Sequence, residues 1–230
     1  MQPRHVVLVH GLWHGAWSWD AVAAALQERG IPVTAVDLPM RTLAGDVTVV
    51  RAALDRIEEP VVLVGHSYGG AVVTAAGDHR QVVRLCFIAA FALAEGESIS
   101  RVAPQEEVPE TGLGDALQFS EDGNDVSIDP SRAADLLYNR SPPAVVRAAL
   151  TRLRPVGRAL FGGRPGSVAW RTRPSTYVVC TDDRTVAPQL QRIMAGRLTD
   201  QREWDCDHSP LAACPDVVAD LLTELATTPG

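Results

Sequence analysis

The stretch of sequence that decides the fold runs Val61-Val62-Leu63-Val64-Gly65-His66-Ser67-Tyr68-Gly69-Gly70-Ala71-Val72-Val73. It begins with a continuous apolar run of strand length and ends with small residues that suit a helix. The pattern Gly-x-Ser-x-Gly between them predicts a sharp turn from strand to helix, with Ser67 exposed at the turn. Gly65 and Gly69 are expected there because neighbouring backbone crowds the turn. The stretch therefore indicates a nucleophilic serine above the edge of a buried sheet.

Short β-branched runs recur on both sides of this stretch, and segments with helical spacing separate most of them. The predicted strands are residues 5–9, 32–36, 61–64, 82–89, 175–180 and about 202–205. The predicted helices are residues 18–29, 44–57, 68–77, 188–198 and 215–225. Near-continuous apolar strands that alternate with helices indicate a mainly parallel sheet of about six strands, covered by helices on both faces.

The alternation stops in one long segment, residues 95–174, which is predicted to be a helical lid. Residues 1–94 and 175–230 then form the core domain into which the lid is inserted. Helices are expected in the lid over residues 132–138 and 142–153. Ser141 is the predicted N-cap of the second of these helices.

The lid segment carries its charges in two blocks. Residues 95–129 hold ten acidic residues and one Arg, whereas residues 131–173 hold nine Arg and one Asp. Two interpretations are open for such blocks: a solvated charged face, or a lid whose two halves attract each other and fold together.

The composition excludes several classes of protein. With 230 residues, 46% of them hydrophobic, the chain can build a core without disulfides or a structural metal. The net charge of −7 is the wrong sign for a nucleic-acid partner, and the absence of Lys excludes mechanisms that need a lysine amine. The four cysteines, Cys86, Cys180, Cys206 and Cys214, lie in or beside apolar runs and are predicted to be reduced. No membrane span or export signal is recognisable, so a cytoplasmic protein is expected.

The predicted serine needs a base, because a serine hydroxyl is a weak nucleophile near neutral pH. In chains with this motif the partners follow in the order serine, acid, histidine. Of the six histidines only His208 lies late enough in the sequence, in a short loop after the final predicted strand. His208 is therefore the predicted base.

The acid is expected at the end of the strand over residues 175–180, where Asp182 and Asp183 are adjacent. Successive side chains of an extended strand point to opposite sides, so only one of the two can face His208. At this point either remains a candidate. Asp205 and Asp207 are too close in sequence to His208 to hold its far ring nitrogen, and are predicted to cap the loop.

The loop after the first strand should supply a backbone donor for an oxyanion. It reads His10-Gly11-Leu12-Trp13-His14-Gly15-Ala16-Trp17, and the predicted donors are the amides of Leu12 and Tyr68. His10 and His14 are four residues apart, but Gly11 lies between them and no carboxylate is near, which disfavours a metal site. Neither a metal nor a cofactor is predicted.

The motifs together resemble one branch of the α/β-hydrolase superfamily, which contains plant methyl esterases, the salicylate-binding esterase and hydroxynitrile lyases. The resemblance rests on residues 10–17, 35–39, 65–70, 180–183 and 207–210 and is weak across residues 97–170. It implies the α/β-hydrolase fold, an oxyanion donor at Leu12, and Asp183 as the acid of a Ser67–His208–Asp183 triad.

The same resemblance separates two chemistries. The lyases of this branch carry Thr where this chain has Gly11, and Lys directly after the catalytic histidine, where this chain has Ser209. Both differences favour a serine esterase that works through an acyl-enzyme. The alternatives are a hydroxynitrile-lyase-like or C–C bond-cleaving enzyme with the same triad, or a small-molecule receptor that retains the pocket.

The expected substrate is a small or aromatic, largely apolar ester, and a homodimer is compatible with the sequence. No membrane or nucleic-acid partner is expected. The residues predicted to line the substrate pocket are Gly11, Trp13, Leu136, Leu137, Phe161 and Trp170. For the lid residues among them the alternative is simple core packing.

Overall fold

The computed structural model describes residues 3–102 and 108–228. Its main element is a six-stranded sheet in the order β2-β1-β3-β4-β8-β9, in which every neighbouring pair is parallel. The strands are β1 (His5–Val9), β2 (Val33–Val36), β3 (Val61–His66), β4 (Val82–Ile88), β8 (Ser175–Cys180) and β9 (Asp200–Trp204). The predicted parallel sheet is confirmed, with strand boundaries that differ by one or two residues.

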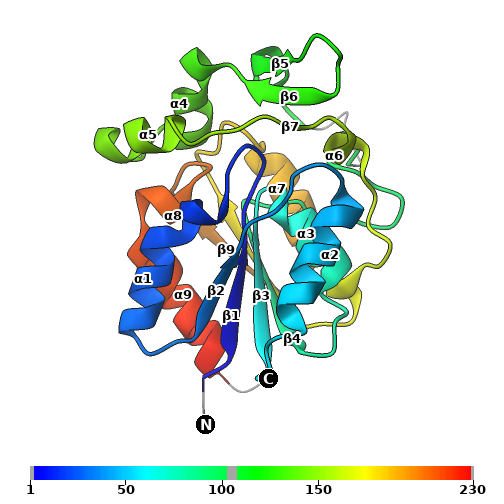
Figure 1. The fold of residues 1–230 in the computed structure, drawn as a ribbon. Helices are drawn as coiled ribbons and strands as arrows, with labels where there is room; N and C mark the ends of the chain where they lie inside the picture. Colours follow the sequence, from blue (N-terminus) through cyan, green and yellow to red (C-terminus); the bar gives the residue numbers. More distant parts are fainter. Residues whose placement is uncertain (1–2, 103–107, 229–230) are drawn as a thin grey trace.

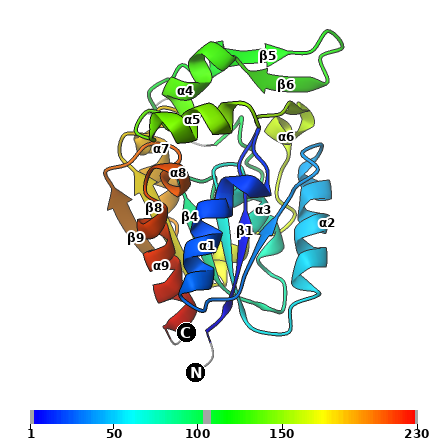
Figure 2. The ribbon, with the colours of Figure 1, turned by 60° about the vertical axis from the view of Figure 1, so that its left-hand side comes forward.

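Helices cover both faces of this sheet, because alternate strand residues point to opposite sides. Val6 and Leu8 of β1 pack in a cluster with α1 (Asp20–Glu28) and α9 (Pro215–Thr227). Val7 and Val9 of the same strand belong to the opposite cluster. That cluster contains residues of α2 (Leu43–Leu54), α3 (Gly69–Ala76) and α7 (Pro188–Ala195). Figures 1 and 2 show α1 and α9 on one side of the sheet and α2 and α3 on the other.

The segment predicted to be a lid lies across the edge at which the parallel strands end (Figure 1). Its helices are α4 (Pro130–Tyr138), α5 (Pro143–Leu150) and α6 (Ala159–Gly162), with short 3-10 turns η3 (Gly114–Ala116) and η4 (Ala169–Arg171). It also contains an antiparallel sheet of β5 (Leu117–Phe119), β6 (Asp125–Ile128) and β7 (Val156–Gly157), which the sequence pattern did not predict. These strands have two to four residues, too few for a periodic signal.

The charge blocks of this segment pair chiefly with the core rather than with each other. Among the ion pairs of the described residues, only Arg171 with Glu95 joins the two blocks. By contrast, arginines of the second block contact core carboxylates: Arg140 with Asp182 and Asp205, Arg152 with Asp20, and Arg154 with Asp37. The two halves meet instead through the backbone pairing of β6 with β7. Charge attraction within the lid is therefore not what joins them. Two acids of the first block, Glu106 and Glu107, lie outside the described residues.

The predicted N-cap of α5 is wrong. Pro142 occupies the cap position, and the Ser141 hydroxyl donates to Asp207 Oδ2 at 3.2 Å instead. The helix begins at Pro143, one residue later than predicted, so Ser141 lies before the cap position and its hydroxyl donates to the core carboxylate. No helix in the described part of the chain is long and apolar enough to cross a bilayer. The division into a core domain and a lid domain stays a prediction.

Candidate active site

The turn between β3 and α3 has the geometry that its sequence predicted. Ser67 adopts a positive φ of 52°, which is strained for a residue with a side chain. A Cβ on Gly65 would lie 2.7 Å from the Gly69 backbone, and a Cβ on Gly69 would lie 2.4 Å from Val9 O. Both glycines are needed because backbone closes on the turn from two sides. The prediction that Ser67 is exposed at the turn is wrong: the residue is only 6% exposed, because the loop after β1 passes directly against it.

His208 lies in the loop between β9 and α8 (Pro210–Ala213), beside this turn. Its ring centroid is 4.8 Å from that of His66, the residue before Ser67, and the His66 Nε2–H donates to His208 O at 2.7 Å. On the other side, His208 Nδ1 donates to Asp183 Oδ2 at 2.7 Å. The histidine and the carboxylate are both buried. This hydrogen bond fixes the orientation of the ring and leaves Nε2 as the nitrogen that can accept a proton.

The Asp183 carboxylate is held by four donors. Oδ1 accepts the backbone N–H groups of Thr185 at 2.7 Å and Val186 at 2.9 Å. Oδ2 accepts Gln191 Nε2 at 2.7 Å in addition to the His208 ring. These donors satisfy both oxygens of a carboxylate whose side chain is fully buried. Asp183 is therefore suited to hold and balance a protonated His208.

Gln191 is a residue that the sequence analysis missed. It lies on the buried side of α7, and its amide also donates to Val186 O and accepts the Cys180 N–H. One side chain thus ties the end of β8 to the Asp183 turn. A polar residue on the apolar face of the predicted helix over residues 188–198 is the signal that could have identified it.

The neighbouring carboxylate, Asp182, points away from His208. Its Oδ2 accepts Asn139 Nδ2 at 3.0 Å and lies 3.2 Å from Arg140 Nε, both from the segment after α4. Asp207 caps its own loop, as predicted, by accepting the Ser209 N–H at 3.0 Å, and it also accepts the Arg140 N–H at 2.9 Å. The choice that spacing left open is thus resolved in geometry: Asp183 is the carboxylate that contacts the histidine.

The loop after β1 closes the other side of the serine. A Cβ on Gly11 would lie 2.8 Å from Ser67 Cβ, so the loop passes directly against the nucleophile position. Among the described residues, neither the Leu12 N–H nor the Tyr68 N–H has a backbone acceptor. Two free amides beside a serine can stabilise a developing oxyanion. Trp13, with a φ of 64°, is the strained residue that turns the loop.

Two buried histidines, His10 and His14, brace this loop. His10 Nδ1 donates to Gly11 O at 2.9 Å, and its Nε2 accepts the Leu38 N–H at 3.0 Å. His14 Nδ1 donates to Leu12 O at 2.6 Å, and its Nε2 accepts the Tyr138 hydroxyl of α4 at 2.5 Å. Burial lowers the pKa of His10 to about 4 and that of His14 to about 3, so both rings are neutral near pH 7. All four ring nitrogens have hydrogen-bond partners, so these rings fix the path of the loop.

Tyr68, a predicted oxyanion donor, is anchored by a second residue that the sequence analysis missed. Its hydroxyl donates to Asp46 Oδ2 at 2.7 Å, and Asp46 Oδ1 accepts the Met40 N–H at 2.9 Å. Burial raises the pKa of Asp46, although these hydrogen bonds favour its charged form. Asp46 belongs to α2, so the bond ties the start of α3 to the neighbouring helix. No local motif announces this contact, because the two residues are 22 positions apart.

Ser67 Oγ and His208 Nε2 have no hydrogen-bond partner within residues 3–102 and 108–228. Catalytic hydrogen bonds are often long without a substrate and shorten in the complex. A cavity of about 540 Å³ lies beside the site. Its wall includes Phe91, whose N–H donates to Ser67 O, and Thr185 and Val186, which hold Asp183. It also borders Leu190 of α7, whereas Ser67, Asp183 and His208 are not among the described residues that line it.

The residues predicted to line a substrate pocket are dispersed in the structure. Gly11 lies against Ser67, but Trp13 is buried with its indole bonded to Val126 O, and Leu136 and Leu137 are buried on α4. Phe161 borders a different cavity, of about 900 Å³, next to β5 and α6. The Trp170 indole donates to Leu93 O, which favours core packing over substrate contact. Only Gly11 is brought against the serine.

Comparison with known proteins finds a matching family and relatives named as esterases. A model described as the alpha/beta hydrolase family matches residues 6–221. The chain is 29% identical to methylesterase 2 of Arabidopsis thaliana, over 97% of this chain and 96% of that protein. It is 28% identical to esterase PIR7B of Oryza sativa subsp. japonica, also over 97% and 96%. The chain is also 28% identical to the putative methylesterase 11, chloroplastic, of Arabidopsis thaliana, and it spans 65% of the length of that protein.

The fold is also that of solved structures. Polyneuridine aldehyde esterase matches with a TM-score of 0.84 at 24% sequence identity, over 97% of this chain and 99% of that one. At this identity the likeness concerns the fold alone. The six-stranded sheet and its flanking helices are therefore shared with known hydrolase structures.

Proposed function

The chain belongs to the alpha/beta hydrolase family, and we propose that it is a serine esterase that cleaves a small, largely apolar carboxylic ester. The observation that carries this proposal is the buried hydrogen bond from His208 Nδ1 to Asp183 Oδ2, next to a strained Ser67. Relatives named methylesterase and esterase at 28–29% identity support ester hydrolysis as the reaction.

In the proposed mechanism Ser67 Oγ attacks the ester carbonyl while His208 Nε2 removes its proton. Asp183 holds the histidine in the required tautomer and stabilises the imidazolium. The Leu12 and Tyr68 amides stabilise the oxyanion, and the histidine then returns the proton to the departing alcohol. Water, activated by His208, releases the acid from the acyl-enzyme.

Hydrolysis is favoured over hydroxynitrile cleavage because there is no space for a side chain at residue 11. A Cβ there would lie 2.8 Å from Ser67 Cβ, so the threonine of the lyases would displace the serine or the loop. The residue after the histidine, Ser209, supplies no charge for a cyanide ion, and its hydroxyl has no partner in the described part of the chain. Mandelonitrile cleavage is therefore expected near background.

The proposal is tested with a fluorophosphonate probe and with p-nitrophenyl and methyl esters of graded size. Wild type should be labelled once and should hydrolyse the esters. Ser67→Ala should remain folded, lose labelling, and lose about 10⁴-fold or more in kcat. Ser209→Ala, which changes a buried serine beside His208, is the matched control and should still be labelled. Labelling of Ser67→Ala at another serine would overturn the assignment.

The remaining expectations stay predictions. A cytoplasmic location, a homodimer, and the absence of membrane and nucleic-acid partners concern the environment of the protein rather than its chemistry. The contribution of Trp13, Leu136, Leu137, Phe161 and Trp170 to substrate binding also stays a prediction, and Gly11 is the member of that set with the strongest geometric support.

A further inference from the structure

Two thiols flank the loop that carries His208. Cys206 lies two residues before the histidine and Cys214 six residues after it, and their Sγ atoms are 3.5 Å apart. Both are free cysteines and pack in one small cluster with Ala89 and Cys180. The esterase mechanism uses neither of them. A pair of thiols in contact across eight residues of chain can form a disulfide if the sulfur atoms approach to about 2.05 Å.

The two thiols differ in reactivity. Cys214 is partly exposed and directly precedes α9, whose N-terminus favours a thiolate. A hydrogen bond from Cys206 lowers the pKa of Cys214. The same bond, together with burial, raises the pKa of Cys206, which is 4% exposed and lies 3.7 Å from Asp207 Oδ1. Cys214 is therefore the attacking thiolate and Cys206 the protected thiol.

We propose that Cys206 and Cys214 form an oxidisable pair, which a peroxide converts to an intramolecular disulfide that restrains the His208 loop. The Cys214 thiolate attacks one peroxide oxygen, giving a sulfenic acid and releasing hydroxide or alkoxide. The Cys206 thiol then displaces the sulfenic oxygen as water and forms the S–S bond. In sum, two thiols and one hydrogen peroxide give one disulfide and two waters, so the two electrons pass to the peroxide.

The bridge should alter the active site because the loop between the cysteines holds the base. The sulfurs must move together by more than 1 Å, from 3.5 Å. Cys206 O accepts the Asp182 N–H, and the next residue, Asp183, holds His208 Nδ1, so a shift of Cys206 reaches the histidine through this turn. Displacement of a catalytic group by about 1 Å can cost about a hundredfold in rate. This consequence rests on the proposed esterase function, whereas formation of the bridge does not.

The experiment treats reduced protein with hydrogen peroxide and follows thiols and activity separately. Wild type should lose two of its four thiols, and peptide mapping should show Cys206 linked to Cys214. Ester kcat/KM should fall at least about tenfold and recover with dithiothreitol. Cys214→Ser should form no bridge and keep its activity. Cys206→Ser should stop at a sulfenic acid that dimedone traps. Cys86→Ser, which changes a buried thiol in β4, is the control and should behave as wild type.

The outcomes separate the two proposals. Four unchanged thiols, a bridge to Cys180, or over-oxidation of Cys214 to a sulfinic acid in wild type would each overturn the thiol pair. A bridge that forms without any change in kcat/KM would overturn its effect on the His208 loop. Absence of ester hydrolysis in the reduced protein would instead contradict the esterase proposal, and the thiol count and peptide map would still test the bridge.

Discussion

Asp182 and Asp183 are adjacent in sequence and belong to two different regions of the molecule. Asp183 faces the core and holds His208, and each of its bonds is to a core residue. Asp182 faces the lid segment and contacts Asn139 and Arg140. The first carboxylate is buried, whereas the side chain of the second is 39% exposed. The Asp183 contacts are thus buried, charge-assisted hydrogen bonds, whereas the Asp182 contacts with the lid are half-exposed. The lid also packs on the core through buried side chains, among them Leu136, Leu137 and Tyr138.

The positions of residues in the two regions depend on contacts of different sequence separation. In the core, the position of Ser67 follows from local backbone: a strand, two glycines and a helix start. In the lid, the positions depend on side-chain partners far away in sequence, such as His14 with Tyr138. The exposed ion pairs of the lid, such as Arg152 with Asp20, contribute little each, so changes at these pairs should be tolerated better than changes at the buried groups of the core.

The largest expected effect tests the two carboxylates directly. Asp183→Asn removes the acceptor that orients His208, and we expect kcat to fall at least about a hundredfold, since loss of this partner costs about 10⁴ in the chymotrypsin-type triad. Asp182→Asn, the matched control, should lose less than about tenfold. Steady-state kinetics on an activated ester measures both. The reverse ranking would move the acid to Asp182, and two mild effects would place it elsewhere.

The second prediction compares two glycines, one in each region. A Cβ on Gly69 would lie 2.4 Å from Val9 O, whereas a Cβ on Gly162 of α6 would meet nothing within 4 Å. Gly69→Ala should therefore reduce the free energy of unfolding by about 3 kcal/mol, because backbone must move to admit the methyl group. Gly162→Ala should be neutral or slightly stabilising. Urea denaturation measures both, and an equal loss would contradict the contrast between core and lid.

The same contrast explains which features the sequence could predict. The sheet and Ser67 were predictable, because apolar runs and Gly-x-Ser-x-Gly constrain backbone locally, and chain order alone selected His208. Asp183 could not be separated from Asp182 by spacing, and only the resemblance chose between them. Gln191 and Asp46 were missed because the site residues they hold, Asp183 and Tyr68, are 8 and 22 positions away.

The lid was harder to predict for physical reasons. The strands β5, β6 and β7 are too short to show a period, and β7 pairs with β6 across about thirty residues of chain. The charge blocks suggested attraction within the lid, but arginine also finds the acidic groups of the core surface. A sequence pattern gives the charges of such groups and not their partners.

The third prediction uses pH to ask whether lid and core unfold together. The pKa of His10 is about 4 and that of His14 about 3 in the folded chain, below the unfolded value near 6.5. The unfolded chain therefore binds more protons between these values. The stabilisation is complete above pH 6.5 and is lost as the pH falls, by about 1.4 kcal/mol per pH unit for each histidine. Urea unfolding between pH 7 and 5 measures this slope.

Substitution assigns the slope to each region. His10→Gln and His14→Gln should each lower the slope of the unfolding free energy against pH by the contribution of about one proton. His10 bonds only core groups, whereas His14 also accepts from Tyr138 of α4. Equal effects would show that lid and core unfold as one unit. A smaller effect for His14→Gln would show that α4 detaches first and lets His14 take up its proton in the folded core.

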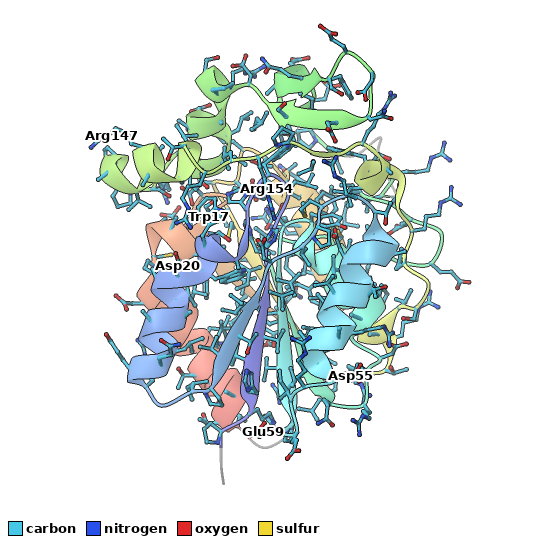
Figure 3. The ribbon with its side chains drawn as sticks, viewed as in Figure 1. Trp17, Asp20, Asp55, Glu59, Arg147 and Arg154 are labelled. Carbon is cyan, nitrogen blue, oxygen red and sulfur yellow. The ribbon has the colours of Figure 1, made fainter. Side chains whose placement is uncertain are left out.

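The smallest effects concern the arginines between lid and core. Figure 3 labels one of them, Arg154, beside the loop after β1. It also labels Arg147, which points outward from α5. Arg154 donates to His14 O at 3.1 Å, Leu38 O at 2.8 Å and Asp37 Oδ1 at 3.2 Å. Arg154→Gln leaves two backbone carbonyls without this donor, so we expect a loss of about 1–2 kcal/mol.

Arg152 has weaker contacts than Arg154, although both lie in the segment after α5. Its guanidinium is 3.6 Å from Asp20 Oδ2 and 4.6 Å from the centre of the Trp17 ring, and both charged side chains are at least half exposed. Exposed ion pairs contribute at most about 1 kcal/mol, and salt screens them. Arg152→Gln should therefore reduce the free energy of unfolding by less than Arg154→Gln, and the difference from wild type should shrink in 1 M NaCl. Arg147→Gln is the control and should have no effect. If Arg152→Gln cost as much as Arg154→Gln at high salt, stacking on Trp17 rather than charge would hold the lid at this point.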